Sequence, residues 1–237
     1  MKRNLIIAGV ACVAALALAG GGAYVYFFSG LRTSPSALGL SATPSPAASS
    51  SPSDVAGKWT VTTGSQAEYR VQEQFVGETS KHLAVARTST ISGNLTVSGD
   101  SSGYQVSAIT FTAVLSDLHS VDSVVGHSVT QRDSFVARQM NLQQFPNATF
   151  TATSASVVAA DTSQQVSTTV PGKLTIHGVT KDVTATAKAQ MTGGKIEIAG
   201  SVSINMTDYG ISPPSVGFTT SDSQVTIGFD IFLTKSA

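Results

Sequence analysis

Cysteine is almost absent from this 237-residue chain, since Cys12 is the only one. It lies in an apolar N-terminal run, so the remainder of the chain has no disulfide, no thiol nucleophile and no cysteine metal site. Acylation of Cys12 is disfavoured, because Gly9-Val10-Ala11 lacks the usual leucine three positions before the cysteine. A small side chain buried in a membrane is the preferred interpretation.

Charge is scarce as well. Charged residues make up 12% of the chain, and 14 Lys and Arg balance 14 Asp and Glu. Without a basic excess there is no electrostatic basis for holding a phosphate backbone, so nucleic-acid binding is not expected. Serine and threonine supply most of the polarity, a composition that favours strands and turns over long surface helices.

Motifs for metal binding and catalysis are also missing. The chain has no His-x-x-x-His or Glu-x-x-His pair among its four histidines, which are His82, His119, His127 and His177. Metal ligation is therefore not expected. No Gly-x-Ser-x-Gly turn presents a serine nucleophile, so we expect no enzyme activity and predict no catalytic residue. His177 is interpreted as an exposed, turn-flanking imidazole that hydrogen-bonds its hairpin, in preference to a ligand contact.

One long apolar run is present, over residues 5–28 behind Lys2 and Arg3. As a helix it would span roughly 36 Å, enough for a hydrocarbon core of about 30 Å. The preceding charges predict a cytoplasmic N-terminus, which leaves the rest of the chain outside the cytoplasm. The alternative is a signal peptide cleaved at Ala17-Leu18-Ala19, followed by secretion. The run continues through aromatic residues to Phe28, which favours an uncleaved anchor in the cell membrane.

Residues 29–54 are dominated by Ser, Pro, Ala and Thr. Such a segment has too little apolar surface to offset the entropy of ordering, and its prolines keep it extended. The predicted organisation is therefore a cytoplasmic tip and transmembrane signal anchor at residues 1–28, a disordered linker at 29–54 and a folded domain at 55–237. About 180 residues can bury a sizeable core as one domain.

From Trp59 onward the chain predicts β-strands separated by turn signals. The predicted strands are residues 58–63, 69–75, 88–97, 104–115, 148–156, 172–177, 182–191, 195–206 and 225–234. Residues 128–143 break this pattern, because a stripe recurs there at helical spacing, made of Val129, Arg132, Val136 and Met140. One amphipathic helix is predicted, ending near Pro146.

The last two predicted strands place apolar side chains at alternate positions. Each strand therefore has a dry and a wet face, and many such antiparallel strands close into a barrel or pack as a sandwich. Several inward positions carry small residues, namely Ala185, Ala187, Ala189 and Gly200. These could leave a tunnel along a barrel of about eight strands, or could admit larger neighbours from across the core. The residues alone leave both alternatives open.

Arg132 and Asp133 are adjacent, and adjacent residues on a helix do not face each other, so they need separate partners. Asp133 is expected to pair with the first helical turn or with a strand residue. For Arg132 the preferred interpretation is a charge network that anchors the helix to the strands. The alternative is a polar head group bound at the mouth of a barrel.

A family resemblance rests on a hairpin and three further segments. The hairpin, residues 172–184, alternates Leu174 and Ile176 with polar residues and then reverses at Gly178, where glycine tolerates positive φ. The other segments are residues 132–135 (Arg-Asp-Ser-Phe), 145–150 (Phe-Pro-Asn-Ala-Thr-Phe) and 200–211, which ends in Asp-Tyr-Gly-Ile. In this order they resemble the YceI-like family of lipid- and polyisoprenoid-binding proteins, over roughly residues 59–235.

The resemblance implies an all-β fold, an antiparallel lipocalin-like β-barrel of about eight strands with one amphipathic helix. It also implies that a long apolar lipid, a polyisoprenoid or an isoprenoid quinone, binds along the barrel axis without catalysis and with no other cofactor. Face alternation and the resemblance together predict the lipid-binding residues Phe111, Phe135, Phe150, Ile198, Val202, Ile204, Ile227, Phe229 and Arg132. The chief alternative is a membrane-tethered barrel with a solid core that binds a protein or cell-envelope partner. A homodimer is compatible with either reading.

Overall fold

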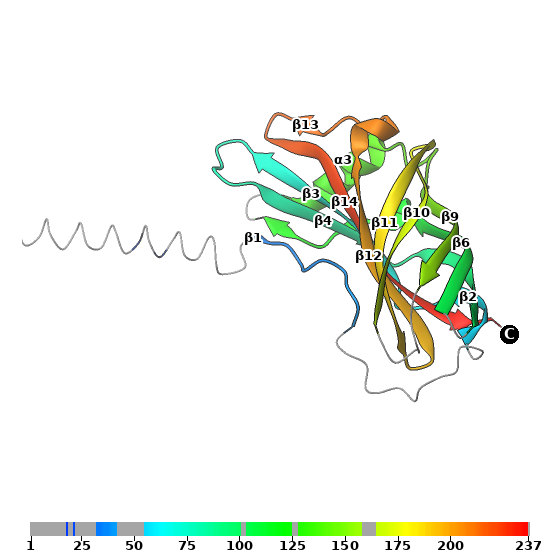
Figure 1. Ribbon diagram of the computed structural model, residues 1–237. Helices are drawn as coiled ribbons and strands as arrows, with labels where there is room; N and C mark the ends of the chain where they lie inside the picture. The colour runs from blue at the N-terminus through cyan, green and yellow to red at the C-terminus, as the bar shows by residue number, and fades with distance from the viewer. Residues whose placement is uncertain are drawn as a thin grey trace, which may run out of the picture.

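The structure, a computed structural model, describes residues 18, 21, 32–41, 55–100, 103–124, 128–157 and 165–236. Its long strands (Figure 1) are β2 (Gly57–Val61), β3 (Gln66–Phe75), β4 (His82–Thr88), β5 (Ile91–Asp100), β6 (Gly103–Val114), β9 (Asn147–Val157), β10 (Val166–Ile176), β11 (Val179–Thr192), β12 (Lys195–Asn205) and β14 (Thr219–Lys235). The two-residue strands are β1 (Arg32–Thr33), β7 (His119–Ser120), β8 (Ser123–Val124) and β13 (Ser215–Val216). The helical segments are η1 (Leu115–Asp117), α3 (Val129–Gln139) and η2 (Met206–Tyr209).

Eight of the long strands close into an antiparallel barrel. Each pairs with the next in the order β2, β5, β6, β9, β10, β11, β12 and β14, and β14 pairs back to β2. Strand β14 joins two parts of the wall, because its last residues pair with β2 whereas its first two thirds pair with β3. On its other edge β3 pairs with β4, and β4 pairs with β7. The wall of the barrel therefore spreads outward at this end (Figure 1). The predicted eight-stranded antiparallel barrel with one helix is confirmed.

Inward and outward faces alternate along the strands as predicted. On β12, Val202 and Ile204 are buried, whereas Ser203 between them is exposed. Cross-strand partners share a face, so β14 presents Ile227 and Val225 to the same side. The buried side chains form two clusters along the barrel, one around Trp59, Leu95 and Ile231 and one around Val71, Ile204 and Tyr209.

Three inward-facing glycines make room for aromatic rings on neighbouring strands. The close pairs are Gly93 with Phe111, Gly172 with Phe150 and Gly200 with Phe229. A Cβ atom on Gly200 would lie 2.8 Å from the Phe229 ring and 2.0 Å from the backbone oxygen of Thr186. Real side chains do not approach so closely, so each ring lies over a glycine backbone. At these positions the small residue admits a larger neighbour.

Strand β4 is the element that the alternation pattern does not reveal. Sequence periodicity predicts one strand over residues 88–97, whereas the structure has β4 and β5 on either side of a short break. Of the residues in β4, only Leu83 and Arg87 are partly exposed and the rest are buried. A strand buried on both faces has no wet side and therefore no alternation. The helix α3 also ends earlier than predicted, at Gln139.

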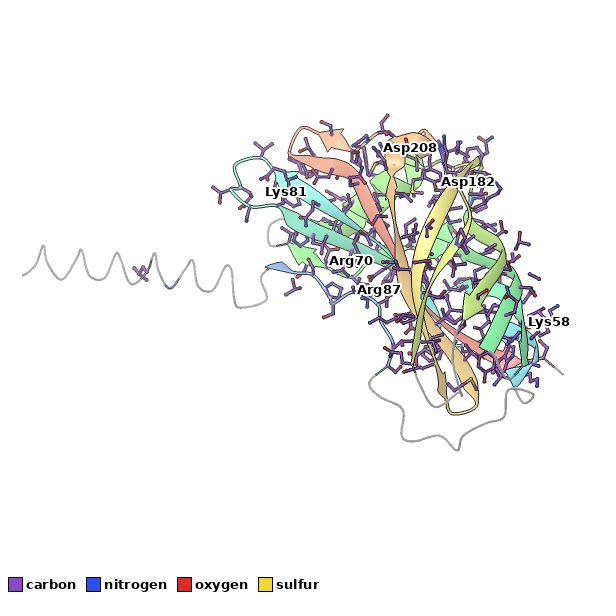
Figure 2. All side chains as sticks on the ribbon, viewed as in Figure 1. Lys58, Arg70, Lys81, Arg87, Asp182 and Asp208 are labelled. Atoms are coloured by element: carbon purple, nitrogen blue, oxygen red, sulfur yellow. The ribbon has the colours of Figure 1, made fainter. Side chains whose placement is uncertain are left out.

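Residues 34–41, which we call the strap, lie against the outer face of the barrel. The Ser34 hydroxyl donates to the Leu83 carbonyl oxygen at 2.6 Å. Arg70 and Arg87, seen side by side in Figure 2, donate to the carbonyl oxygens of Pro35 and Ser36. Just before the strap, β1 pairs with β8.

Two buried carboxylates hold the other half of the strap. Glu68 accepts the Leu38 N–H at 3.1 Å, and Glu197 accepts both the N–H and the hydroxyl of Ser41, at 2.6 and 2.8 Å. Buried carboxylates require hydrogen-bond donors, and extended backbone supplies them. The polar composition of residues 29–54 predicts a disordered linker, but residues 34–41 within it make specific contacts.

Asp230 lies near Glu197, and its Oδ1 atom is buried without a hydrogen-bond partner among the described residues. Burial, together with the Glu197 carboxylate, raises the pKa of Asp230 to about 6. Since the unfolded value is about 3.9, ionisation costs folding free energy. That cost is fully present above about pH 6 and disappears below about pH 4.

We therefore expect Asp230→Asn to raise the melting temperature at neutral pH by about 2–4 °C and to have little effect near pH 4. Thermal melts of both proteins across this range measure the difference. Asp208→Asn, at an exposed position in η2, is the control and should show no such pH dependence. A gain from Asp230→Asn that is equal at all pH values would contradict the assignment.

Among the residues that the structure describes, no helix is long and apolar enough to cross a membrane. The predicted anchor lies outside the described residues, except for Leu18 and Gly21. The division of the chain into anchor, linker and domain stays a prediction.

Candidate functional site

The spread end of the barrel holds a cavity of about 840 Å³ between α3 and the strands. The predicted helical stripe faces this cavity, since Val129, Arg132, Val136 and Met140 all line it. From the strands, Val71, Ile204 and Ile227 contribute apolar wall. The charged residues of the lining are Glu68, Glu73, Arg132 and Arg138, and Glu73 pairs with Arg132. The lining is thus mainly apolar with a few charged groups.

A second, narrower cavity of about 230 Å³ continues into the closed part of the barrel. Both cavities share four lining residues, Ala67, Ala113, Ala148 and Ile227, so the two spaces are adjacent there. The narrow cavity is lined almost entirely by aliphatic and aromatic side chains, with Thr112, Thr168 and Gln190 as polar members. Its room comes from small inward residues on one strand of the wall: Ala185, Ala187 and Ala189 of β11.

The two alternatives for small inward residues are therefore both realised, at different positions. Glycines such as Gly200 admit an aromatic ring from the next strand. The alanines of β11 leave space that no neighbour fills. The barrel has internal room, which the solid-core alternative did not anticipate.

All nine predicted lipid-binding residues line one cavity or the other. The wide cavity is lined by Phe135, Arg132, Ile204 and Ile227, and the narrow cavity by Phe111, Phe150, Ile198, Val202, Phe229 and again Ile227. The structure thus gathers these residues around two adjacent, mainly apolar cavities. Their contact with a ligand stays a prediction.

Arg132 joins α3 to the barrel through a buried network. Its guanidinium donates to Glu73 of β3 at 3.1 Å and also to Asp122 and to the Ser120 hydroxyl. Asp122 in turn accepts the Val85 N–H at 3.0 Å and lies 2.7 Å from Nε2 of His82. The charge network preferred from the sequence is confirmed. The guanidinium also borders the wide cavity.

Asp133 has a separate partner, as its position next to Arg132 requires. Its carboxylate accepts both the N–H and the hydroxyl of Ser120 in β7. Ser120 therefore contacts both helix residues, because its hydroxyl also accepts a hydrogen bond from the Arg132 guanidinium. The expectation that Asp133 pairs with a strand residue is confirmed, and the helix is fixed over the cavity by two adjacent side chains.

Burial and pairing shift the pKa values of this network in opposite directions. Burial alone raises the pKa of the Asp122 carboxyl, but hydrogen bonds from His82 and Arg132 outweigh it and lower the pKa to about 2. Glu73 has a raised pKa, because burial exceeds the favourable effect of Arg132. Burial also raises the pKa of the Tyr69 hydroxyl. Asp122 and Arg132 are thus ionised in the folded protein, next to an uncharged phenol.

His177 occupies the turn between β10 and β11, with a φ of 53°. Its Nδ1 atom lies 3.1 Å from the Tyr209 carbonyl oxygen, and its ring packs edge-on against Phe145. His177 flanks the turn as predicted, but it is half-buried and its hydrogen-bond partner belongs to η2, so the predicted exposure and the predicted hydrogen bond to the hairpin are wrong. In the described part of the chain, no group of three His, Cys, Asp or Glu is arranged to hold a metal ion.

Sequence reasoning missed the network around Arg132. Its partners Glu73 and Asp122, and His82 beyond Asp122, belong to three different segments and form no motif. The sequence does give one usable signal, because the apolar stripe of α3 contains Arg132. An arginine is almost never buried unless it is paired. That signal predicts a buried acid but cannot say which one.

A family model for the YceI-like domain matches residues 59–233. The chain belongs to the YceI-like family. The resemblance drawn from the hairpin and its three companion segments is thereby confirmed. No curated protein matches the chain in sequence.

Solved structures of similar fold include two bacterial proteins. A polyisoprenoid binding domain from Saccharophagus degradans, implicated in plant cell wall breakdown, gives a TM-score of 0.52 at 14% identity, covering 76% of this chain and 99% of that one. Burkholderia cenocepacia BcnA gives a TM-score of 0.47 at 16% identity, covering 71% of this chain and 95% of that one. At these identities the likeness concerns the fold alone.

Proposed function

We propose that this YceI-like barrel binds a long apolar lipid, a polyisoprenoid or an isoprenoid quinone, and carries it without chemical change. The observation that supports this most directly is the pair of adjacent cavities, the larger under α3 and the smaller inside the closed barrel, where strands β5, β6, β9, β10, β11, β12 and β14 line it. A long apolar chain suits spaces that lie end to end and are lined mainly by Val, Ile, Leu and Phe. The polyisoprenoid binding domain of similar fold supports the choice of ligand.

The free energy of such binding comes from burial. Each methylene group removed from water contributes about 0.8 kcal/mol, so affinity grows with chain length until the cavities are filled. Polar groups at the edge of the wide cavity, such as Gln139 and Arg132, lie where the less apolar end of a ligand would be. Arg132 already donates to two carboxylates, so we assign it to holding the helix and to bordering the ligand.

Native mass spectrometry of the full-length chain, purified in mild detergent, tests this function. We expect an added mass that solvent extraction identifies as an isoprenoid or a related long-chain lipid. Apo protein should take up polyprenols of increasing length with increasing affinity. A clean apo mass and no uptake of polyprenols or isoprenoid quinones would contradict the proposal, and would favour a barrel that serves as an interaction module.

We also propose that residues 5–28 anchor the chain in the cell membrane with the barrel outside the cytoplasm. The supporting observations are the length of the apolar run and the two positive charges before it. Full-length protein should stay with the membrane after an alkaline wash. Recovery of a shortened chain in the soluble fraction would instead support the cleaved signal peptide.

A further inference from the structure

Two large apolar side chains are exposed next to the wide cavity. Val76, in the turn between β3 and β4, is 74% exposed, and Phe218, between β13 and β14, is 52% exposed. The Val76 N–H donates to the Phe218 carbonyl oxygen at 2.9 Å, so the two turns form one tip. This tip lies at the upper left of the barrel in Figure 1. Phe218 also lines the cavity, so the apolar tip borders its mouth.

The N-terminal segment is held at the same end of the molecule. Strand β1 pairs with β8, placing Arg32 opposite Val124, and Val124 lines the wide cavity. The strap follows, and its hydrogen bonds to Glu68 and Glu197 hold it along the barrel. The apolar run ends at Phe28, four residues before Arg32. Four residues of extended chain span at most roughly 14 Å, so the end of that run stays near the cavity mouth.

We propose that the mouth of the wide cavity docks on the surface of the membrane that holds the apolar run, with Val76 and Phe218 entering the interface. This rests on the proposed lipid binding and on the proposed anchor. The ligand then passes between bilayer and cavity without crossing water. Each methylene exposed on a path through water would raise the barrier to transfer, so contact between mouth and bilayer lowers that barrier.

A lipid surface is the occupant that these observations favour. The exposed tip is small and consists of one aliphatic and one aromatic side chain, which is far less than the area of a stable protein interface. The proposed membrane anchor at residues 5–28, in contrast, keeps the tip close to a bilayer. A second copy of the chain or another protein at the tip is an alternative outcome of the experiment.

The experiment uses the full-length chain in vesicles of phosphatidylcholine and phosphatidylglycerol. In a Cys12→Ser background, a single cysteine at position 76 or 218 carries an environment-sensitive fluorophore, and Lys58→Cys carries it as control. Lys58 is exposed and lies at the opposite end of the barrel from Lys81, which is close to the tip in sequence and space (Figure 2). Nitroxide groups on the lipids quench only fluorophores that contact the membrane.

We expect at least twofold stronger quenching at positions 76 and 218 than at position 58. Equal, weak quenching at all three positions overturns the proposal. A blue-shifted emission at position 76 or 218 without quenching by lipid also overturns it, and indicates a protein partner. The lipid content of the same samples is measured by extraction. Weak quenching of a barrel that still contains lipid would count against docking alone. Strong quenching of a barrel that contains no lipid would count against the proposed function alone.

A second variant tests the strap without changing any barrel residue. Leu38→Pro/Ser41→Pro removes the N–H group that donates to Glu68, and both the N–H group and the hydroxyl that donate to Glu197. We expect quenching at position 76 to fall by at least half while lipid uptake stays unchanged. Ala37→Pro, at an exposed strap residue, is the matched control. Unchanged quenching in the double variant would remove the strap from the docking mechanism.

Discussion

Ala187→Phe is expected to abolish the binding of long isoprenoids while leaving the binding of short ones largely intact. Ala187 is buried on β11, faces inward and lines the narrow cavity of about 230 Å³. A phenyl ring at this position fills much of that space and confines a ligand to the wide cavity. Excluding a single five-carbon isoprene unit costs about 3–4 kcal/mol in lost burial, which corresponds to more than a hundredfold in affinity.

Thr184→Phe is the matched control, because Thr184 lies on the same strand with its side chain exposed. Affinities of both variants for a series of polyprenols, measured by native mass spectrometry or ligand fluorescence, decide the matter. Thermal melts check that the barrel remains folded, since overpacking a core costs about 1–3 kcal/mol. Wild-type affinity of Ala187→Phe for the longest polyprenol would show that the narrow cavity takes no part in binding.

The sequence was most informative where a strand has one wet and one dry face. Alternation predicts both β12 and β14, and it places the ends of β12 within a few residues of those observed. It also assigns Val202, Ile204 and Ile227 to the inner face, where they line the cavities. It does not predict β4, because both faces of that strand are buried. It also misses the start of β14, where Thr219–Ser221 are polar residues paired with β3 and, in part, with β13.

The shape of the site depends on strand register, which the sequence does not determine. Gly200 and Ala187 are paired in the register of β11 and β12 and both are small. The glycine is covered by Phe229, whereas the alanine borders empty space. Which small residue is filled depends on which strand supplies an aromatic ring opposite it. The tunnel was therefore predictable only through the family resemblance.

Contacts between distant segments were the least predictable part. Glu68 and Glu197 lie on the outer face of the barrel, where alternation predicts solvated side chains, yet both are buried beneath the strap. Ser41 and Glu197 are 156 positions apart. A Ser- and Pro-rich segment has no apolar pattern that would announce docking, because its attachment uses backbone N–H groups that every residue except proline possesses.

Arg132→Met is expected to lower the free energy of unfolding by about 3–5 kcal/mol, the usual cost of removing one partner from a buried ion pair. Arg132 donates to Glu73 and Asp122, and the Asp122 carboxylate is fully buried. Without the guanidinium, two carboxylates remain in a region of low dielectric, with Nε2 of His82 2.7 Å from Asp122. Denaturant unfolding measures the loss. Arg138→Met, at an exposed position on the same helix, is the control and should change stability little.

The dependence of this loss on pH identifies its cause. In the wild type the Asp122 pKa is lowered to about 2, below its unfolded value of about 3.9. The resulting stabilisation is therefore present above about pH 4 and is lost as pH falls toward 2. The difference between wild type and Arg132→Met should be greatest at neutral pH and should narrow below about pH 4. Adding Asp122→Asn to Arg132→Met should recover part of the stability, because one unpaired charge is removed. A loss that is constant with pH and is not relieved by Asp122→Asn would mean that the methylenes of Arg132, and not its charge, hold α3 over the cavity.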